Sequence, residues 1–270
     1  MNRILIILGV LLVSLSTPGQ KAYWKSSYSK INAPVGGTKN IKDIVKKEFV
    51  YPMKALTDNV EGAVDISYRL NKDGTPKVLS VSGIDNDLLI AEAKRIFGKI
   101  RFPYSKLRTG SESPDLFQLA FSKKDWMKLY NKRKYREIEY PHLPIDSTQR
   151  LYHYQLLEKK PEPIFSKKEP YSDFYDYIVN KLEYPPEALK LGLKGDVVVS
   201  FVIEQSGHVT NIEIIKTMPA GCTEEALRLI KNVKWFPALE NGIAVRTLMK
   251  SSIGFGVKSS PYQESFNQGN

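Results

Sequence analysis

The feature that most constrains this chain is an internal repeat, in which several motifs recur at the constant spacing that separates Tyr51 from Tyr184. The matching pairs are Tyr51-Pro52 with Tyr184-Pro185, Gly62 with Gly195, and Gly74 with Gly207. Such a repeat is typical of one supersecondary unit that is built twice. A chain of 270 residues that contains two copies is therefore predicted to fold as two small domains, each with its own core.

Apolar and polar side chains alternate after the first glycine of each copy. The apolar members are Val64, Ile66, Tyr68 and Leu70 in the first copy, and Val197, Val199, Phe201 and Ile203 in the second. A period of two is typical of a strand that has one face on a core. Each strand runs into a glycine turn and a second apolar stretch, so each copy is predicted to contain a β-hairpin.

Helical spacing precedes and follows each hairpin. The leading segments carry Ile41, Val45 and Phe49, matched by Phe174, Ile178 and Leu182; the later ones carry Ala93, Ile96, Phe97 and Ile100, matched by Ala226, Leu229, Ile230 and Val233. Spacings of three and four residues place these side chains on one helix face. A last strand is predicted over 116–121 and 245–257, one residue out of register after Phe102-Pro103 and Phe236-Pro237. Each copy thus reads helix, helix, strand, strand, helix, strand.

Residues 1–20 are predicted to be a signal peptide. Arg3 precedes an apolar run from Ile4 to Leu15, which is too short for a typical membrane-spanning helix and suits a signal-peptide core. Cleavage is expected between Ser16 and Gln20. The alternative is an uncleaved segment that anchors the protein in the inner membrane.

Residues 123–170 are predicted to be a basic linker between the domains. The segment is rich in lysine and arginine and contains five prolines between Pro141 and Pro170, which argues for an extended, hydrated chain. A short helix that docks Trp126 and Leu129 on the first domain is expected at its start. The tail at 259–270 is polar and expected to be frayed.

The formal net charge of +11 favours anionic partners, and export makes nucleic acid an unsuitable one. Peripheral contact with a membrane surface or a cell-wall polymer is the alternative that fits the tyrosine-interleaved lysines of the linker. No catalytic, metal-binding or cofactor motif is present: the three histidines lack metal-ligand spacing, and the single cysteine, Cys222, is expected to be buried. We therefore expect a binding protein rather than an enzyme.

The second copy contains five characteristic stretches: Tyr-Pro-Pro-Glu-Ala from Tyr184, the strand Gly-Asp-Val-Val-Val-Ser-Phe-Val-Ile from Gly195, Gly-Cys-Thr-Glu-Glu-Ala-Leu from Gly221, Lys-Trp-Phe-Pro-Ala from Lys234, and Asn241-Gly242. Together they resemble the C-terminal domain of TonB, and the stretch from Gly221 resembles the form found in Bacteroidota. The resemblance covers the domain predicted at 171–258. The domain predicted at 38–122 is a degenerate relative, in which Phe102 replaces the tryptophan.

The resemblance implies an α+β fold in which each domain is a short antiparallel sheet with helices packed on one face. It also implies a periplasmic protein that captures an extended segment of an outer-membrane receptor by strand addition. The partner-binding residues implied are Tyr184, Pro185, Arg246, Thr247, Leu248, Met249, Lys250, Ser251, Ser252, Ile253, Gly254 and Phe255. Tyr184 and Pro185 have an alternative role, which is to set the start of the fold.

Two functions remain open at this stage. The first is a TonB-related interaction protein of outer-membrane transport, which would need a membrane anchor to transduce energy. The second is a structural or regulatory adaptor that binds other envelope proteins with the same fold. An exposed sheet edge also allows a homodimer.

Overall fold

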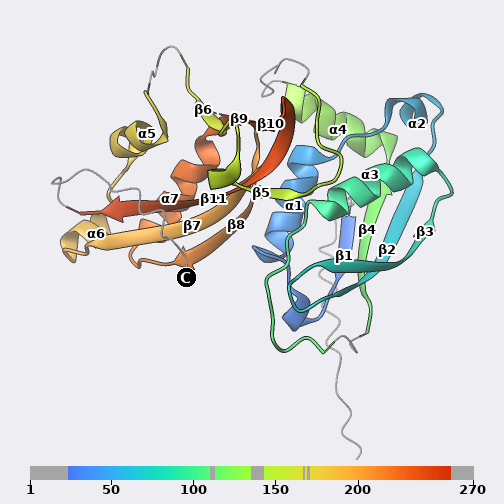
Figure 1. The fold of residues 1–270 in the computed structure, drawn as a ribbon, viewed down its shortest axis with the longest axis horizontal. Coiled ribbons are helices and arrows are strands. Elements are labelled where there is room, and N and C mark those ends of the chain that lie inside the picture. The colour runs from blue at the N-terminus through green and yellow to red at the C-terminus, as the bar shows by residue number, and fades with distance from the viewer. Residues whose placement is uncertain (1–23, 110–112, 135–142, 167, 169–170, 257–270) are drawn as a thin grey trace, which may run out of the picture. The chain divides into compact units, whose positions relative to one another are not determined.

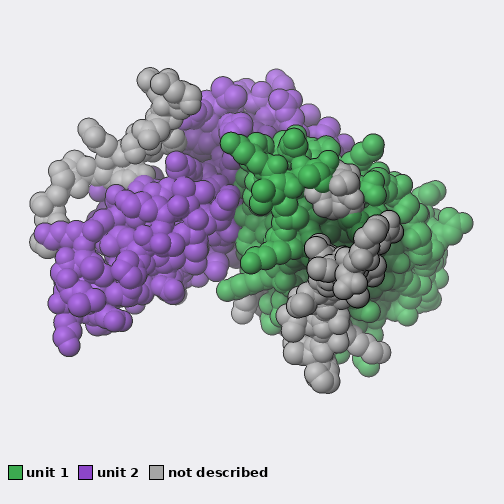
Figure 2. All heavy atoms as spheres, turned by 90° about the horizontal axis from the view of Figure 1, so that it is seen from below, with its two compact units in different colours: residues 1–139 green, residues 140–270 purple. Residues whose placement is uncertain are grey.

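The computed structural model describes residues 24–109, 113–134, 143–166, 168 and 171–256. The chain divides into two compact units, unit 1 at residues 1–139 and unit 2 at residues 140–270 (Figure 2). The predicted signal peptide at 1–20 and the tail at 259–270 lie outside the described residues. Among the helices that the structure describes, none is long and apolar enough to cross a bilayer.

Unit 1 is a four-stranded antiparallel sheet with helices on one face (Figure 1). The spatial strand order is β1-β4-β2-β3. In chain order its elements are β1 (Trp24–Ser27), η1 (Lys30–Asn32), α1 (Gly37–Glu48), α2 (Met53–Thr57), β2 (Gly62–Leu70), β3 (Pro76–Gly83), α3 (Asp87–Gly98), β4 (Asp115–Phe121) and α4 (Lys123–Lys134). Helices α1 and α3 pack over the sheet because their apolar stripes need a second layer to be buried.

Unit 2 repeats this plan with additions. Its elements are β5 (Leu151–His153), η2 (Tyr154–Leu156), β6 (Glu162–Ile164), α5 (Phe174–Lys181), α6 (Pro186–Lys190), β7 (Gly195–Ile203), β8 (Val209–Lys216), α7 (Cys222–Asn232), β9 (Lys234–Phe236), β10 (Ala238–Glu240) and β11 (Ile243–Phe255). The main sheet has the order β10-β11-β7-β8, with β5 also paired to β11, and β6 pairs with β9. The predicted α+β class, with antiparallel sheets and helices, is confirmed.

The element bounds follow the spacing seen in the sequence. Strands β2 and β7, strands β3 and β8, and helices α2 and α6 each begin and end at the spacing that separates Tyr51 from Tyr184. In the last strands the spacing is one residue longer, because Gly62 faces Phe121 across β2 and β4 whereas Gly195 faces Phe255 across β7 and β11. The one-residue change of register that the sequence predicts is therefore present in the strand pairing.

The predicted helix faces are the ones that the two cores bury. Ala93, Ile96, Phe97 and Ile100 are buried under the sheet of unit 1, and Ala226, Leu229, Ile230 and Val233 occupy the same places in unit 2. The alternating apolar residues of β2 and β7 are likewise buried. The amphipathic helix faces and the alternating strand residues therefore identify the core of each unit, because burying apolar area stabilises the fold.

The prediction of an extended linker at 123–170 differs from the structure. Helix α4 buries Trp126 and Leu129 in the core of unit 1, as the sequence predicts. Beyond it, however, β5 and β6 pair with β11 and β9, so residues 151–164 belong to the fold of unit 2. Pro163 lies within β6 itself, opposite Trp235 of β9, which is compatible with the proline because β6 is an edge strand.

Candidate functional site

The predicted edge strand β11 is open on one side for about half of its length. Its residues Thr247–Phe255 pair with Ile203–Gly195 of β7. On the opposite side, Ile243–Val245 pair with β10 and Arg246–Leu248 pair in parallel with β5. No strand among the described residues lies beside Met249–Phe255 on that side. We call this stretch the open edge.

The prediction that the edge begins at Arg246 is therefore wrong for its first three residues. Thr247 and Leu248 have a strand on each side, and Arg246 pairs with Leu151 of β5. The Arg246 side chain is buried and forms an ion pair with Glu204, with Nε 2.8 Å from Oε2. The physical reason is β5, which comes from the segment between the two repeats. It pairs with the backbone N–H and C=O groups of β11 that the prediction left free.

Side chains on the open edge alternate between the core and solvent. Ile253 and Phe255 are buried in the core of unit 2, and Met249 packs against it. Lys250 and Gly254 are exposed on the other face. Lys250 is the one charged residue of this stretch, and a lysine is a common device against unwanted pairing at an edge. The open edge therefore presents backbone groups with an apolar floor and one exposed cation.

Tyr184 lies at the end of the open edge but has a structural role. Its ring packs edge-on against Phe255, with centroids 5.8 Å apart and planes at 86°, and its hydroxyl donates a hydrogen bond to the carbonyl of Leu193. In unit 1, Tyr51 packs on Phe121 at 5.6 Å and 85°, and donates to the carbonyl of Val60.

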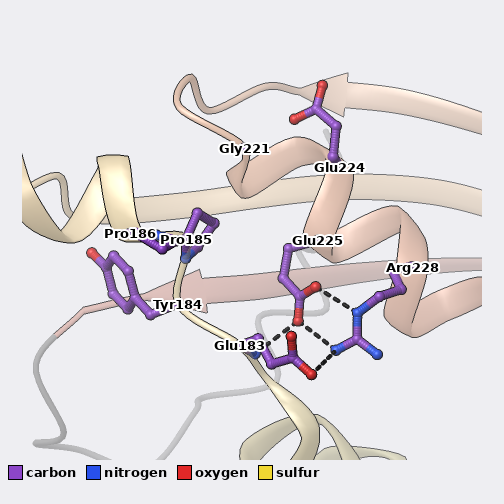
Figure 3. Close-up of a pocket in the computed structure, with 8 residues that line it drawn as sticks. All are labelled: Glu183, Tyr184, Pro185, Pro186, Gly221, Glu224, Glu225 and Arg228. Carbon is purple, nitrogen blue, oxygen red and sulfur yellow. Dashed lines mark hydrogen bonds and ion pairs between the residues drawn. The ribbon is translucent and has the colours of Figure 1, made fainter.

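The same pair of contacts in both units indicates that this tyrosine joins the start of the fold to the last strand. Pro185 precedes α6 and lines a shallow pocket with Tyr184 and the start of α7 (Figure 3).

A carboxylate–guanidinium clamp lines part of this pocket (Figure 3), and the sequence patterns did not predict it. Glu225 accepts the backbone N–H of Glu183 at 2.7 Å and an Nε–H bond from Arg228 at 2.6 Å. Arg228 also donates to the carbonyl of Lys181 at 2.8 Å. The hydrogen bond that Arg228 donates to the Glu225 carboxylate raises the pKa of Arg228 above its ordinary value. The clamp joins α5 to α7.

The clamp recurs in unit 1 as Glu92 and Arg95. Glu92 accepts the backbone N–H of Val50 at 2.7 Å, and Arg95 donates to Glu92 and to the carbonyl of Glu48. A Glu-x-x-Arg motif that recurs at the spacing of the internal repeat is the signal that could have revealed it. Because both units contain the clamp, we assign it to stability rather than to a ligand.

Within the described residues, the histidines and the cysteine do not assemble into a metal site. No group of three or more His, Cys, Asp and Glu side chains with the geometry of a metal site is found in the part of the chain that the structure describes. His208 lies in the β7–β8 turn, where its Nδ1 is 3.0 Å from the Ser206 hydroxyl. Cys222 is the first residue of α7 and is buried, as predicted.

Burial makes the thiol of Cys222 a weaker acid than a free cysteine. Desolvation, with a smaller contribution from the charge of Glu224, raises the pKa of the thiol. A raised pKa leaves a smaller thiolate fraction at any given pH, and the buried sulfur reacts only when unit 2 opens. We expect iodoacetamide at pH 8 to alkylate the native protein at least about a hundredfold more slowly than the urea-unfolded chain. Mass spectrometry measures both rates, and nearly equal rates would contradict the expectation.

One comparison with known proteins places a family likeness in unit 2. A family model described as the Gram-negative bacterial TonB protein C-terminal matches residues 180–257. The chain is also similar to the solution NMR structure of the Pseudomonas aeruginosa TonB CTD, with 18% sequence identity and a TM-score of 0.25; the alignment covers 37% of this chain and 90% of that chain. Curated proteins gave no match. The family match includes the whole of the open edge.

Proposed function

We propose that this chain, whose residues 180–257 match the TonB C-terminal family model, is a TonB-related envelope protein that binds partner segments by strand addition to β11. The proposed partners are outer-membrane receptors of TonB-dependent transport, and the proposed location is the periplasm. The role is binding rather than catalysis. An anchored N-terminus would allow force to be transmitted, and a cleaved one would make the protein a soluble adaptor.

The observation that carries this proposal is the strand already added to the last strand of unit 1. There β1 lies antiparallel to β4, with Trp24 opposite Leu119 and Ser27 opposite Leu116. By the strand register, Leu116–Leu119 correspond to Lys250–Ile253, which lie in the middle of the open edge. One unit of this chain thus holds an added strand at the position that is open in the other.

The geometry also supports a class of bound segment. Cross-strand neighbours share a face, so the residue opposite Ile253 would sit over the apolar floor and the residue opposite Lys250 would face solvent. An apolar side chain at the first position and an acidic one at the second fit these surroundings. Each favourable cross-strand pair contributes about 0.2–1 kcal/mol, and the backbone hydrogen bonds supply affinity for any extended sequence.

The test is photocrosslinking in cells from a crosslinking amino acid placed at Ser252. Gln118 is the matched control, since it holds the corresponding position in unit 1 but is covered by Lys25 of β1. We expect Ser252 to trap outer-membrane receptors through their periplasmic N-terminal segments, in clear excess over Gln118.

Two other results would contradict parts of the proposal. Equal recovery of receptors from both positions would remove the open edge as the binding site. Recovery from Ser252 of other envelope proteins alone, or of this chain itself, would contradict the transport role and favour an adaptor or a homodimer.

A further inference from the structure

The last strand of unit 1 is paired on both sides by its own chain. Strand β2 lies along one side of β4, and the four residues of β1 lie along the other. The pairing is antiparallel over Leu116–Leu119. The edge that would otherwise accept a strand is therefore filled in cis.

Strand β1 adds little to the core that it borders. Trp24 and Ser26 are half-buried, whereas Lys25 and Ser27 are exposed, so no side chain of this strand is fully buried. The main contacts on the inner side are the packing of Trp24 against the core and a side-chain hydrogen bond between Ser26 and Tyr68. These are contacts of an added strand rather than of a central one.

Unit 2 serves as an internal comparison for a fold without this strand. Lys250–Ile253 correspond to the β4 residues that β1 covers, and no described strand lies beside them. Ile253 and Phe255 are nevertheless buried to 1% and 2% exposure by the helices and by β7. The fold of these units therefore closes its core without a strand at this edge.

The chain is fastened to unit 1 immediately after β1. The backbone N–H of Ser29 donates to Oδ1 of Asp115 at 3.1 Å, and the amide of Asn32 donates to Oδ2 of Asp115 at 2.7 Å. Arg108 donates to Oδ1 of Asn32 at 2.9 Å. This buried anchor holds residues 29–32, so β1 can separate from β4 while the anchor stays intact.

We infer that the outer edge of β4 is a second strand-acceptor site and that β1 is its resident, detachable ligand, which keeps unit 1 closed to other extended segments. The anchor holds β1 beside the edge at an effective concentration in the millimolar range or above. A competing segment at a lower concentration must therefore have a higher intrinsic affinity for the edge than β1 has. The class of ligand is an extended peptide with a bulky apolar residue opposite Leu119 and a small one opposite Phe117. The inference shares the strand-addition geometry of the proposed function, but its test needs no receptor.

The first test separates strand and acceptor. The acceptor is the chain that begins at Ser29, and the probe is a synthetic peptide of residues 21–28. We expect the peptide to bind this chain and to slow amide hydrogen exchange in 115–121 by about tenfold or more, as backbone pairing protects amides. The chain that begins at Lys21, which retains β1, should show no such change, and a peptide with Trp24→Ser should bind weakly.

The second test keeps the chain intact and covers the case in which the shortened chain does not fold. Lys25→Cys and Gln118→Cys place two thiols directly opposite each other, at a separation that antiparallel pairs allow for a disulfide. In the reduced protein, the outer amides of β4 should exchange by a local opening, faster than those of the β2–β3 ladder. Oxidation should slow the β4 amides by about tenfold and leave the β2–β3 ladder unchanged.

Either of two results would overturn the inference. One is a chain that begins at Ser29 and folds, but whose β4 amides exchange at the same rate with and without the peptide. The other is an intact chain in which β1, β4 and the β2–β3 ladder exchange together in both redox states, which would make β1 an integral part of one cooperative unit. Neither result depends on whether a receptor is trapped at Ser252, so failure here and failure of the proposed function are distinguishable.

Discussion

Replacing Arg246 with methionine is expected to lower the free energy of unfolding of unit 2 by about 3–5 kcal/mol, because it leaves a buried carboxylate without its partner. The Arg246 and Glu204 side chains are 3% and 0% exposed. Glu204 accepts two bonds from the guanidinium, at 2.8 and 3.1 Å, and one from the Thr210 hydroxyl at 2.5 Å. The neutral hydroxyl of Thr210 cannot replace the lost charge in this interior.

Lys250→Met is the matched control, since it removes a cation from an exposed position of the same strand. A surface change of this kind should stay within about 0.5 kcal/mol. The double variant Arg246→Met with Glu204→Gln should recover most of the loss, because the glutamine keeps an acceptor for Thr210 without a charge. Urea unfolding followed by hydrogen exchange in each unit measures these values. A double variant no more stable than Arg246→Met would show that the uncompensated charge is not the cause.

The same residue fixes how much of β11 is open. Arg246 donates at 2.9 Å to the carbonyl of Gln149, which lies two residues before β5. Loss of the guanidinium removes this attachment, so amides of Leu151–His153 should exchange faster in Arg246→Met than in Lys250→Met. The open edge thus begins at Met249 because a buried ion pair holds a short parallel strand over the three residues before it.

Local sequence patterns were sufficient to predict the helices and strands that occur in both units. Helix faces and hairpins show periods of 3.6 and 2 within one stretch of sequence, and Asn241-Gly242 gives the positive φ values, 51° and 74°, of a tight hairpin turn. That turn joins β10 to β11, and β10 itself is a three-residue strand that the sequence does not reveal.

Strands of three or four residues are too short to show a period. Leu151-Tyr152-His153 and Trp24-Lys25-Ser26-Ser27 form strands only because distant edges accept them, in β11 and β4. Non-local pairing of this kind leaves no trace in nearby residues. For the same reason the edge predicted at Arg246–Phe255 is wrong over Arg246–Leu248. The strand β5 that covers these residues, and the Glu204 that pairs with Arg246, both lie far away along the chain.

Unit 1 differs from unit 2 in how it completes the stretch before its last strand. Unit 2 places β9 and β10 there, whereas unit 1 has a loop that carries Arg108. Arg108 is 1% exposed and donates to Asn32 and to the carbonyls of Ile31 and Pro103, at 2.9, 3.1 and 2.6 Å. One guanidinium therefore joins this loop to the segment that follows β1.

Arg108→Met is expected to lower the free energy of unfolding of unit 1 by about 3 kcal/mol, since it removes the donor from the buried Asn32 amide oxygen and from two partly buried carbonyls. Lys106→Met, an exposed change two residues away in the same loop, is the control and should stay within about 0.5 kcal/mol. Hydrogen exchange should show faster opening of β2 and β4 in Arg108→Met, while β7 and β11 keep their rates. Because Asn32 and Asp115 lose their arrangement, β1 should open more than any other strand. An effect spread equally over both units, or one no larger than that of Lys106→Met, would contradict the role of Arg108 as the anchor of the N-terminal strand.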